Sequence, residues 1–109
     1  MLRDPEHQIF QALCNYLSAR SFALESVFDG AAEPATDTPA KAEAVVASVD
    51  EATVWFKHPA TPGRRYGVFL TPGEGPDLIC DYTCPPAEKD PQGWTAAMDE
   101  FLDWIDANF

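Results

Sequence analysis

The sequence predicts an α+β fold, with one domain over residues 1–109 in which an antiparallel sheet of about five strands is flanked by N-terminal and C-terminal amphipathic helices. Two observations predict it. Apolar and polar residues alternate through 52–83 between Pro/Gly-rich turns, which is typical of an antiparallel meander. Near both ends of the chain, apolar residues instead recur at the spacing of one helix face. The expected order is α-β-β-β-β-β-α.

The first helix is expected to begin at Asp4, because this residue is a favourable cap in front of Pro5 and Glu6. It is expected to end near Arg20. One face of this helix is apolar and should lie against the sheet, with Ile9, Phe10, Leu13, Cys14 and Leu17.

A first strand is expected over residues 22–28, where the period changes from helical to alternating, and Asp29-Gly30 ends it. Residues 30–40 contain two prolines and no large apolar side chain, so they bury little and are expected to form a mobile loop. The valine-rich segment 43–49 is expected to form the second strand. Asp50-Glu51 then links it to the meander.

The meander offers one set of side chains to each face of the sheet. If the helices cover the face that carries Val54 and Phe56, then Trp55 and Phe69 project from the opposite face. A sheet covered on one side normally presents polar residues on the other, so an apolar patch there indicates an interface. Two alternatives remain: the helices divide between both faces, or the loop over 30–40 folds across the aromatic residues.

A closing helix is expected from Gln92 to about Ala107, because Asp90-Pro91 repeats the capping residue and the proline of the N-terminus. One face of this helix is apolar, with Trp94, Met98, Phe101, Leu102 and Ile105. The opposite face carries acidic side chains at Asp99, Asp103 and Asp106.

The formal net charge of −11 limits the classes of partner. The acidic residues concentrate in the last third of the chain, which we call the acidic lobe. From Glu74 to Asp106 it contains nine Asp and Glu residues and a single base, Lys89. A surface of this sign repels nucleic-acid phosphates and anionic lipid headgroups. We therefore expect neither nucleic acid nor a membrane as a direct partner.

The cysteines indicate a reducing compartment. Cys14, Cys80 and Cys84 are an odd number, and the Met1 end of the chain leads directly into a helix rather than into a secretory leader. We therefore expect a cytoplasmic protein with free thiols. Cys80 and Cys84 are spaced as C-x3-C, which matches neither a redox C-x2-C pair nor half of a zinc site, so no metal and no cofactor are expected.

No catalytic signature is present in the sequence. His7 and His58 lack a Ser, Cys or carboxylate at triad-like spacing. The segment 57–65 is more informative, because three of the seven bases, Lys57, Arg64 and Arg65, gather there with His58 at one end of a hairpin. Either these bases balance charge and protect the sheet edge, or they form a site for an anion or an acidic partner.

These observations favour a non-enzymatic, cytoplasmic protein-binding module, such as an accessory protein, an inhibitor, or an immunity-like or chaperone-like protein. Its partner is expected to be a protein, and a basic one where the acidic lobe makes the contact. A homodimer packed sheet to sheet is the simplest cover for the second sheet face. Two alternatives are a small enzyme with a site near the 57–65 hairpin and Asp81 or Tyr82, and a purely structural subunit. The candidate partner-binding residues are Trp55, Phe69, Arg64, Arg65, Asp99, Asp103 and Asp106.

Overall fold

The computed structural model describes residues 1–109 as a four-stranded antiparallel sheet with three α-helices. The strands follow one another in the sheet in the order β1-β2-β3-β4. Two single turns of 3₁₀-helix, η1 (Gly75–Asp77) and η2 (Ala87–Lys89), lie in the connections on either side of β4. In chain order the main elements are α1 (Glu6–Ser18), β1 (Ala23–Phe28), α2 (Pro39–Val46), β2 (Ala52–Lys57), β3 (Arg65–Leu70), β4 (Ile79–Tyr82) and α3 (Trp94–Asn108).

The second strand predicted over 43–49 is wrong, because most of this segment belongs to α2, and the sheet has four strands instead of five. Local signals for a helix precede the valines: Pro39 occupies the first turn, and the Thr38 side chain accepts a hydrogen bond from the Lys41 amide at 3.3 Å. Ala42 and Val46 lie one helical turn apart, and both are buried in the core. The helix therefore buries Val46 without pairing to the sheet, and the order of the helices and strands is α-β-α-β-β-β-α.

The segment predicted as a mobile loop, 30–40, also makes backbone contacts with the sheet edge. Ala35 forms an isolated bridge with Ser26 of β1, and the Thr36 amide donates to the Glu25 carbonyl at 3.1 Å. The last two residues of the segment begin α2. This stretch therefore runs beside β1, on the edge that β2 does not occupy.

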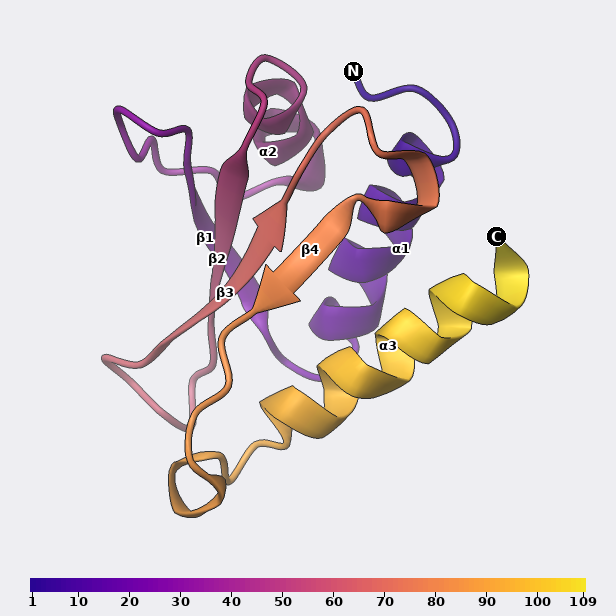
Figure 1. The fold of residues 1–109 in the computed structure, drawn as a ribbon. Coiled ribbons are helices and arrows are strands. Elements are labelled where there is room, and N and C mark those ends of the chain that lie inside the picture. Colours follow the sequence, from indigo (N-terminus) through magenta and orange to yellow (C-terminus); the bar gives the residue numbers. More distant parts are fainter.

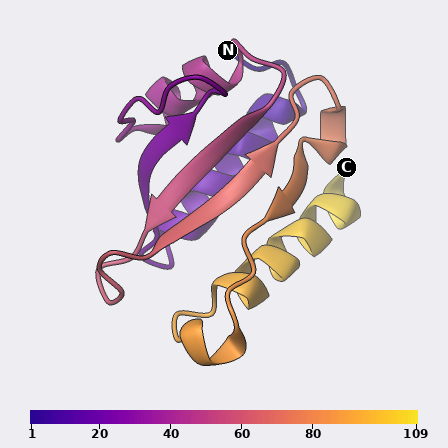
Figure 2. The ribbon, with the colours of Figure 1, turned by 60° about the vertical axis from the view of Figure 1, so that its left-hand side comes forward.

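All three helices contribute to one core on one face of the sheet. In Figure 1, α1 and α3 both lie to the right of the strands, Figure 2 shows α1 behind the sheet, and α2 lies beside α1 near β1. The core is a single cluster of 22 buried residues, with side chains from every helix and every strand. No helix combines the length and the apolar composition that a bilayer crossing requires. The alternative in which the helices divide between both faces of the sheet is therefore wrong.

Trp94, the first residue of α3, lies at the centre of the core. Its ring is fully buried, with ring centroids 5.2 Å from Phe22 and 5.1 Å from Tyr66, and its Nε1–H donates to the Thr83 carbonyl at 2.8 Å. The N-cap residue of this helix is Gly93 and not Asp90 as predicted, although the Asp90 carboxylate does accept hydrogen bonds from the Trp94 and Thr95 amides of the first turn. The helix begins at Trp94 rather than at Gln92, because Gly93 adopts a left-handed conformation with φ 70°.

Two β-bulges decide which side chains face the helices. One interrupts the pairing of β1 with β2 between Leu24 and Ser26, and the other interrupts the pairing of β3 with β4 beside Leu70. An extra residue reverses the alternation beyond it. Val27 consequently lies opposite Val54 in the core, whereas Ser26 lies opposite Trp55 on the other face.

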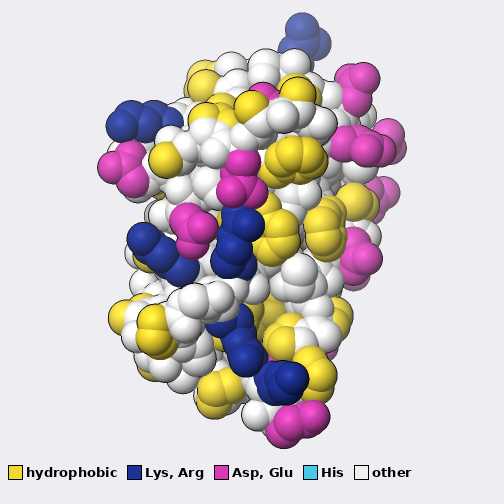
Figure 3. Space-filling model, turned by 90° about the vertical axis from the view of Figure 1, so that its left-hand side faces the viewer, with side chains coloured by type: hydrophobic (Ala, Val, Ile, Leu, Met, Phe, Trp, Pro, Cys, Tyr) yellow, Lys and Arg dark blue, Asp and Glu magenta, His cyan; other side chains and the backbone are white.

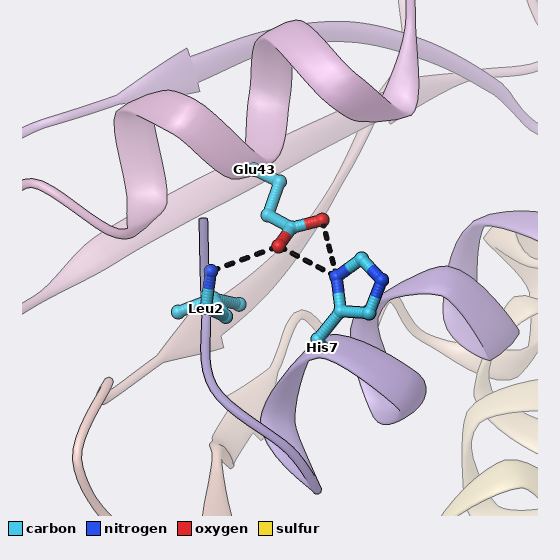
Figure 4. A network of polar contacts seen from close by, with 3 residues as sticks. All are labelled: Leu2, His7 and Glu43. Atoms are coloured by element: carbon cyan, nitrogen blue, oxygen red, sulfur yellow. Dashed lines mark hydrogen bonds and ion pairs between the residues drawn. The ribbon is translucent and has the colours of Figure 1, made fainter.

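Two buried carboxylates hold other segments of the chain against helices α1 and α2. Glu6 of α1 accepts hydrogen bonds from the Gly73 and Gly75 amides at 2.8 and 3.0 Å, which holds the β3–β4 connection against the helix. Glu43 of α2 accepts from the Leu2 amide at 2.8 Å and lies 2.7 Å from Nδ1 of His7 (Figure 4). Charge-assisted bonds of this kind join segments that are distant in sequence.

The Glu6 contacts generate a stability prediction. Glu6→Ala leaves two loop amides without their acceptor, and it is expected to lower the free energy of unfolding by about 1–3 kcal/mol. Gln8→Ala, an exposed change on the same helix, is the matched control and should cost less than about 0.5 kcal/mol. Denaturant unfolding of both variants measures the difference. Equal costs for the two variants would show that the carboxylate contributes nothing to the connection.

Candidate functional site

The sheet face opposite the helices carries no helix of its own, and we call it the outer face. It is the side seen in Figure 3, where a line of basic side chains runs diagonally beside a group of apolar ones. The pairing registers of the four strands place ten residues there, namely Ala23, Ser26, Phe28, Thr53, Trp55, Lys57, Arg65, Gly67, Phe69 and Asp81.

Trp55 lies flat against the sheet rather than projecting into solvent. Gly67 is its partner on β3, and a Cβ at Gly67 would lie only 2.7 Å from the indole ring. The missing side chain therefore creates the space in which the ring lies. The Arg65 guanidinium lies over the indole, 4.2 Å from a ring centroid, in a cation–π contact. The indole is half-buried as a result.

Arg65 is held by the chain's own carboxylates. Its Nη2 donates to Glu33 Oε1 at 2.7 Å and to Ser26 Oγ at 3.2 Å, and its Nε lies 3.3 Å from Glu25 Oε1. Glu33 comes from the segment that follows β1, so part of the predicted loop does fold toward the aromatic residues. The positive charge of Arg65 is thus balanced within the molecule.

The bases beside Arg65 have no such balance. Arg64 donates to the backbone carbonyl of Lys89, and neither Arg64, Lys57 nor Lys89 forms an ion pair with a carboxylate. Nδ1 of His58 accepts a hydrogen bond from the Ala60 amide at 3.1 Å, so the neutral ring carries its proton on Nε2.

These bases line a groove beneath the β2–β3 hairpin, which we call the basic groove. Its volume is about 660 Å³, and its charged lining is Lys57, Arg64, Arg65 and Glu25, with His58 and the exposed Ser21 beside them. A neighbouring hollow of about 310 Å³ shares Arg64 and Arg65 and adds Lys89. Four of the seven bases of the chain therefore lie along one continuous surface.

The opposite end of the outer face is apolar. A hollow of about 240 Å³ is lined by Phe28, Phe69, Leu70 and Cys80, among others. Phe28 is 40% exposed, and Phe69 is half-buried. Phe28 faces this side only because of the bulge in β1, and a strictly alternating strand gives no signal for it.

The predicted acidic residues lie elsewhere. Asp99, Asp103 and Asp106 are exposed on α3, in the helical layer, and we call them the acidic face of α3. Asp99 accepts a hydrogen bond from the Tyr82 hydroxyl, and this bond, together with burial, raises the pKa of Tyr82 to about 12. The structure therefore brings Trp55, Phe69, Arg64 and Arg65 onto one side of the molecule and leaves the three aspartates on α3.

The residues proposed for an enzyme do not converge. Asp81 lies opposite Phe69 on the outer face, whereas Tyr82 faces α3, and neither lines the basic groove. No three His, Cys, Asp or Glu side chains lie close enough together to hold a metal ion. Comparison of the chain with protein-family models, curated proteins and solved structures gave no significant match.

The cysteine environments predict different reactivities. Burial, and secondly the nearby Glu43 carboxylate, raises the pKa of the Cys14 thiol to about 12, whereas Cys80 and Cys84 are exposed. Because the thiolate is the reactive form, iodoacetamide at mildly alkaline pH should label only Cys80 and Cys84 in the native protein and all three in denaturant. Mass spectrometry counts the labels. Rapid native labelling of Cys14 would contradict its buried position.

The contact of Trp55 with Gly67 predicts an energetic coupling. Gly67→Ala places a methyl group against the indole and is expected to cost about 1–3 kcal/mol of stability. In a Trp55→Ala background the same change should cost much less, because the space is then vacant. Denaturant unfolding of the four proteins of this double-mutant cycle measures the coupling. An equal cost in both backgrounds would mean that the glycine is required for another reason.

Proposed function

We propose that the protein is a non-enzymatic protein-binding module of the cytoplasm and that the outer face is its binding surface. One observation carries the proposal: all three helices lie on one side of the sheet, while the other side carries Phe28, Trp55 and Phe69 with no element across them. Partly exposed apolar side chains gathered on one surface mark an interaction site.

The composition of the outer face supports this use. Tryptophan and arginine are among the residues that contribute most to protein–protein affinity, and Trp55 and Arg65 are already stacked on one another. Glu25, Glu33 and Ser26 hold the Arg65 side chain in place. A prearranged pair of this kind loses little conformational freedom on binding, which favours affinity.

Two occupants fit the outer face. A second copy of the chain, packed sheet to sheet about a two-fold axis, covers the aromatic residues of both copies. A different protein is the other occupant, and it leaves the acidic face of α3 free to meet a basic surface. In either case the acidic face of α3 and the outer face act as separate surfaces.

A small enzyme is the second candidate, and the basic groove favours it. The volume of about 660 Å³ lies within the range of small-molecule sites. His58 is the one histidine of the lining, and Asp81 and Tyr82 are outside the groove. The one carboxylate of the lining, Glu25, is already paired with Arg65, so the binding module has the stronger support. A purely structural subunit has no specific observation in its favour.

Site-specific crosslinking tests the proposal. A photoreactive phenylalanine analogue in place of Phe69 should give a discrete adduct in the native cell, because this side chain lies at the interface. The same analogue in place of Gln8, exposed on α1, is the control and should give none. An adduct of twice the chain mass identifies the homodimer, and any other mass identifies a different protein. Adducts from both positions, or from neither, would refute the outer face as the binding surface.

A further inference from the structure

We infer that the basic groove binds the carboxylate side chains of a short acidic segment of the partner protein. The inference rests on the proposed function and specifies the chemistry of the partner. It concerns the end of the outer face at the β2–β3 hairpin, where the basic side chains outnumber the carboxylates.

The positive and negative charges of the groove are not balanced. Glu25 is the only carboxylate in the lining, and it is already paired with Arg65. Lys57 and Arg64 have no carboxylate partner, although the chain carries 18 acidic residues against seven bases. In a chain of this composition, bases left without acids form a site that is complementary to added negative charge.

The molecule itself contains one contact of the kind proposed for the partner. The segment Glu33–Thr36 runs along the free edge of β1, with the Val27 amide donating to the Pro34 carbonyl at 3.4 Å and the Thr36 amide to the Glu25 carbonyl at 3.1 Å. From this position Glu33 reaches Arg65 at 2.7 Å. A segment that runs along the sheet edge therefore already supplies one carboxylate to this surface, whereas the neighbouring bases have no carboxylate partner.

The net negative charge of the molecule favours a short acidic segment over a long polyanion as the ligand. Charges in physiological salt are screened over about 8 Å, so a short acidic segment in the groove interacts mainly with the bases that line it. A nucleic acid or an anionic membrane extends over much more of a surface whose net charge is −11 and is repelled there. The geometry therefore selects a protein segment.

The groove variants test the inference by fluorescence anisotropy. The probe is a labelled ten-residue peptide of glutamates and leucines, and the reference is the same peptide with glutamine in place of glutamate. The first peptide is expected to bind and the second to bind at least about tenfold more weakly. Lys57→Gln with Arg64→Gln should weaken binding of the acidic peptide about tenfold or more, without a change in the thermal midpoint.

A matched pair of substitutions controls for net charge. Arg20→Gln with Lys41→Gln changes the formal charge equally, but Arg20 lies over Tyr16 and Lys41 pairs with Asp37, both outside the groove. This pair should leave peptide binding unchanged.

Glu33→Gln should tighten binding of the acidic peptide several-fold, because it releases Arg65 for the peptide. If Glu33 only stabilised the fold, this substitution would not increase the affinity for the peptide.

Three results would overturn the inference. In the first, the groove pair and the control pair of substitutions weaken peptide binding equally. In the second, duplex DNA or anionic vesicles bind as tightly as the acidic peptide. In the third, the acidic peptide binds neither the wild type nor Glu33→Gln. Because the crosslink from position 69 does not depend on the groove, it still reports on the outer face in each case. Failure of the inference and failure of the proposed function are therefore separable.

Discussion

The packing of Trp94 against Phe22 and Tyr66 is the interaction on which the rest of the molecule depends. It joins the start of α3 to the turn after α1 and to the third strand, so both terminal helices lie on the same face of the sheet. The buried indole also donates its N–H to the chain that leaves β4. Because the core is completed on one side of the sheet, Phe28, Trp55 and Phe69 on the other side lie outside it.

The two bulges give the outer face its composition. In β1 the extra residue turns Ser26 and Phe28 outward and leaves Val27 in the core. In the pairing of β3 with β4, Ile79 lies opposite Leu70 in the core, and the exposed Cys80 lines the apolar hollow beside Phe69. Bulges redirect side chains without changing the order of the strands, and they are common where a sheet has a binding role.

Charge is distributed unevenly between the two sides of the molecule. Arg65 is neutralised by glutamates and serves to cover Trp55, whereas Arg64 and Lys57 are held near it without acids. Asp99, Asp103 and Asp106 lie on the helical side. A molecule of this kind presents two surfaces of different sign to its surroundings, although its net charge is strongly negative.

The sequence by itself determined the features that depend on local physics. The period of two located β2, β3 and β4 within two residues, and the helical period located α1 and α3. The same alternation set Trp55 against Val54 and Phe56, and Phe69 against Val68 and Leu70, on opposite sides of their strands, but it left open which side the helices cover. These properties follow from neighbours a few residues apart.

Only the tertiary structure decided the features that depend on distant residues. Burial of Ala42 and Val46 against α1 and β1 favours a helix where valine content predicted a strand. Arg65 covers Trp55 because Gly67 makes room for the indole and Glu33, 32 residues away, holds the guanidinium. Lys89 joins the basic surface through Arg64, 25 residues away. Such contacts are set by strand register and chain path, which no local pattern encodes.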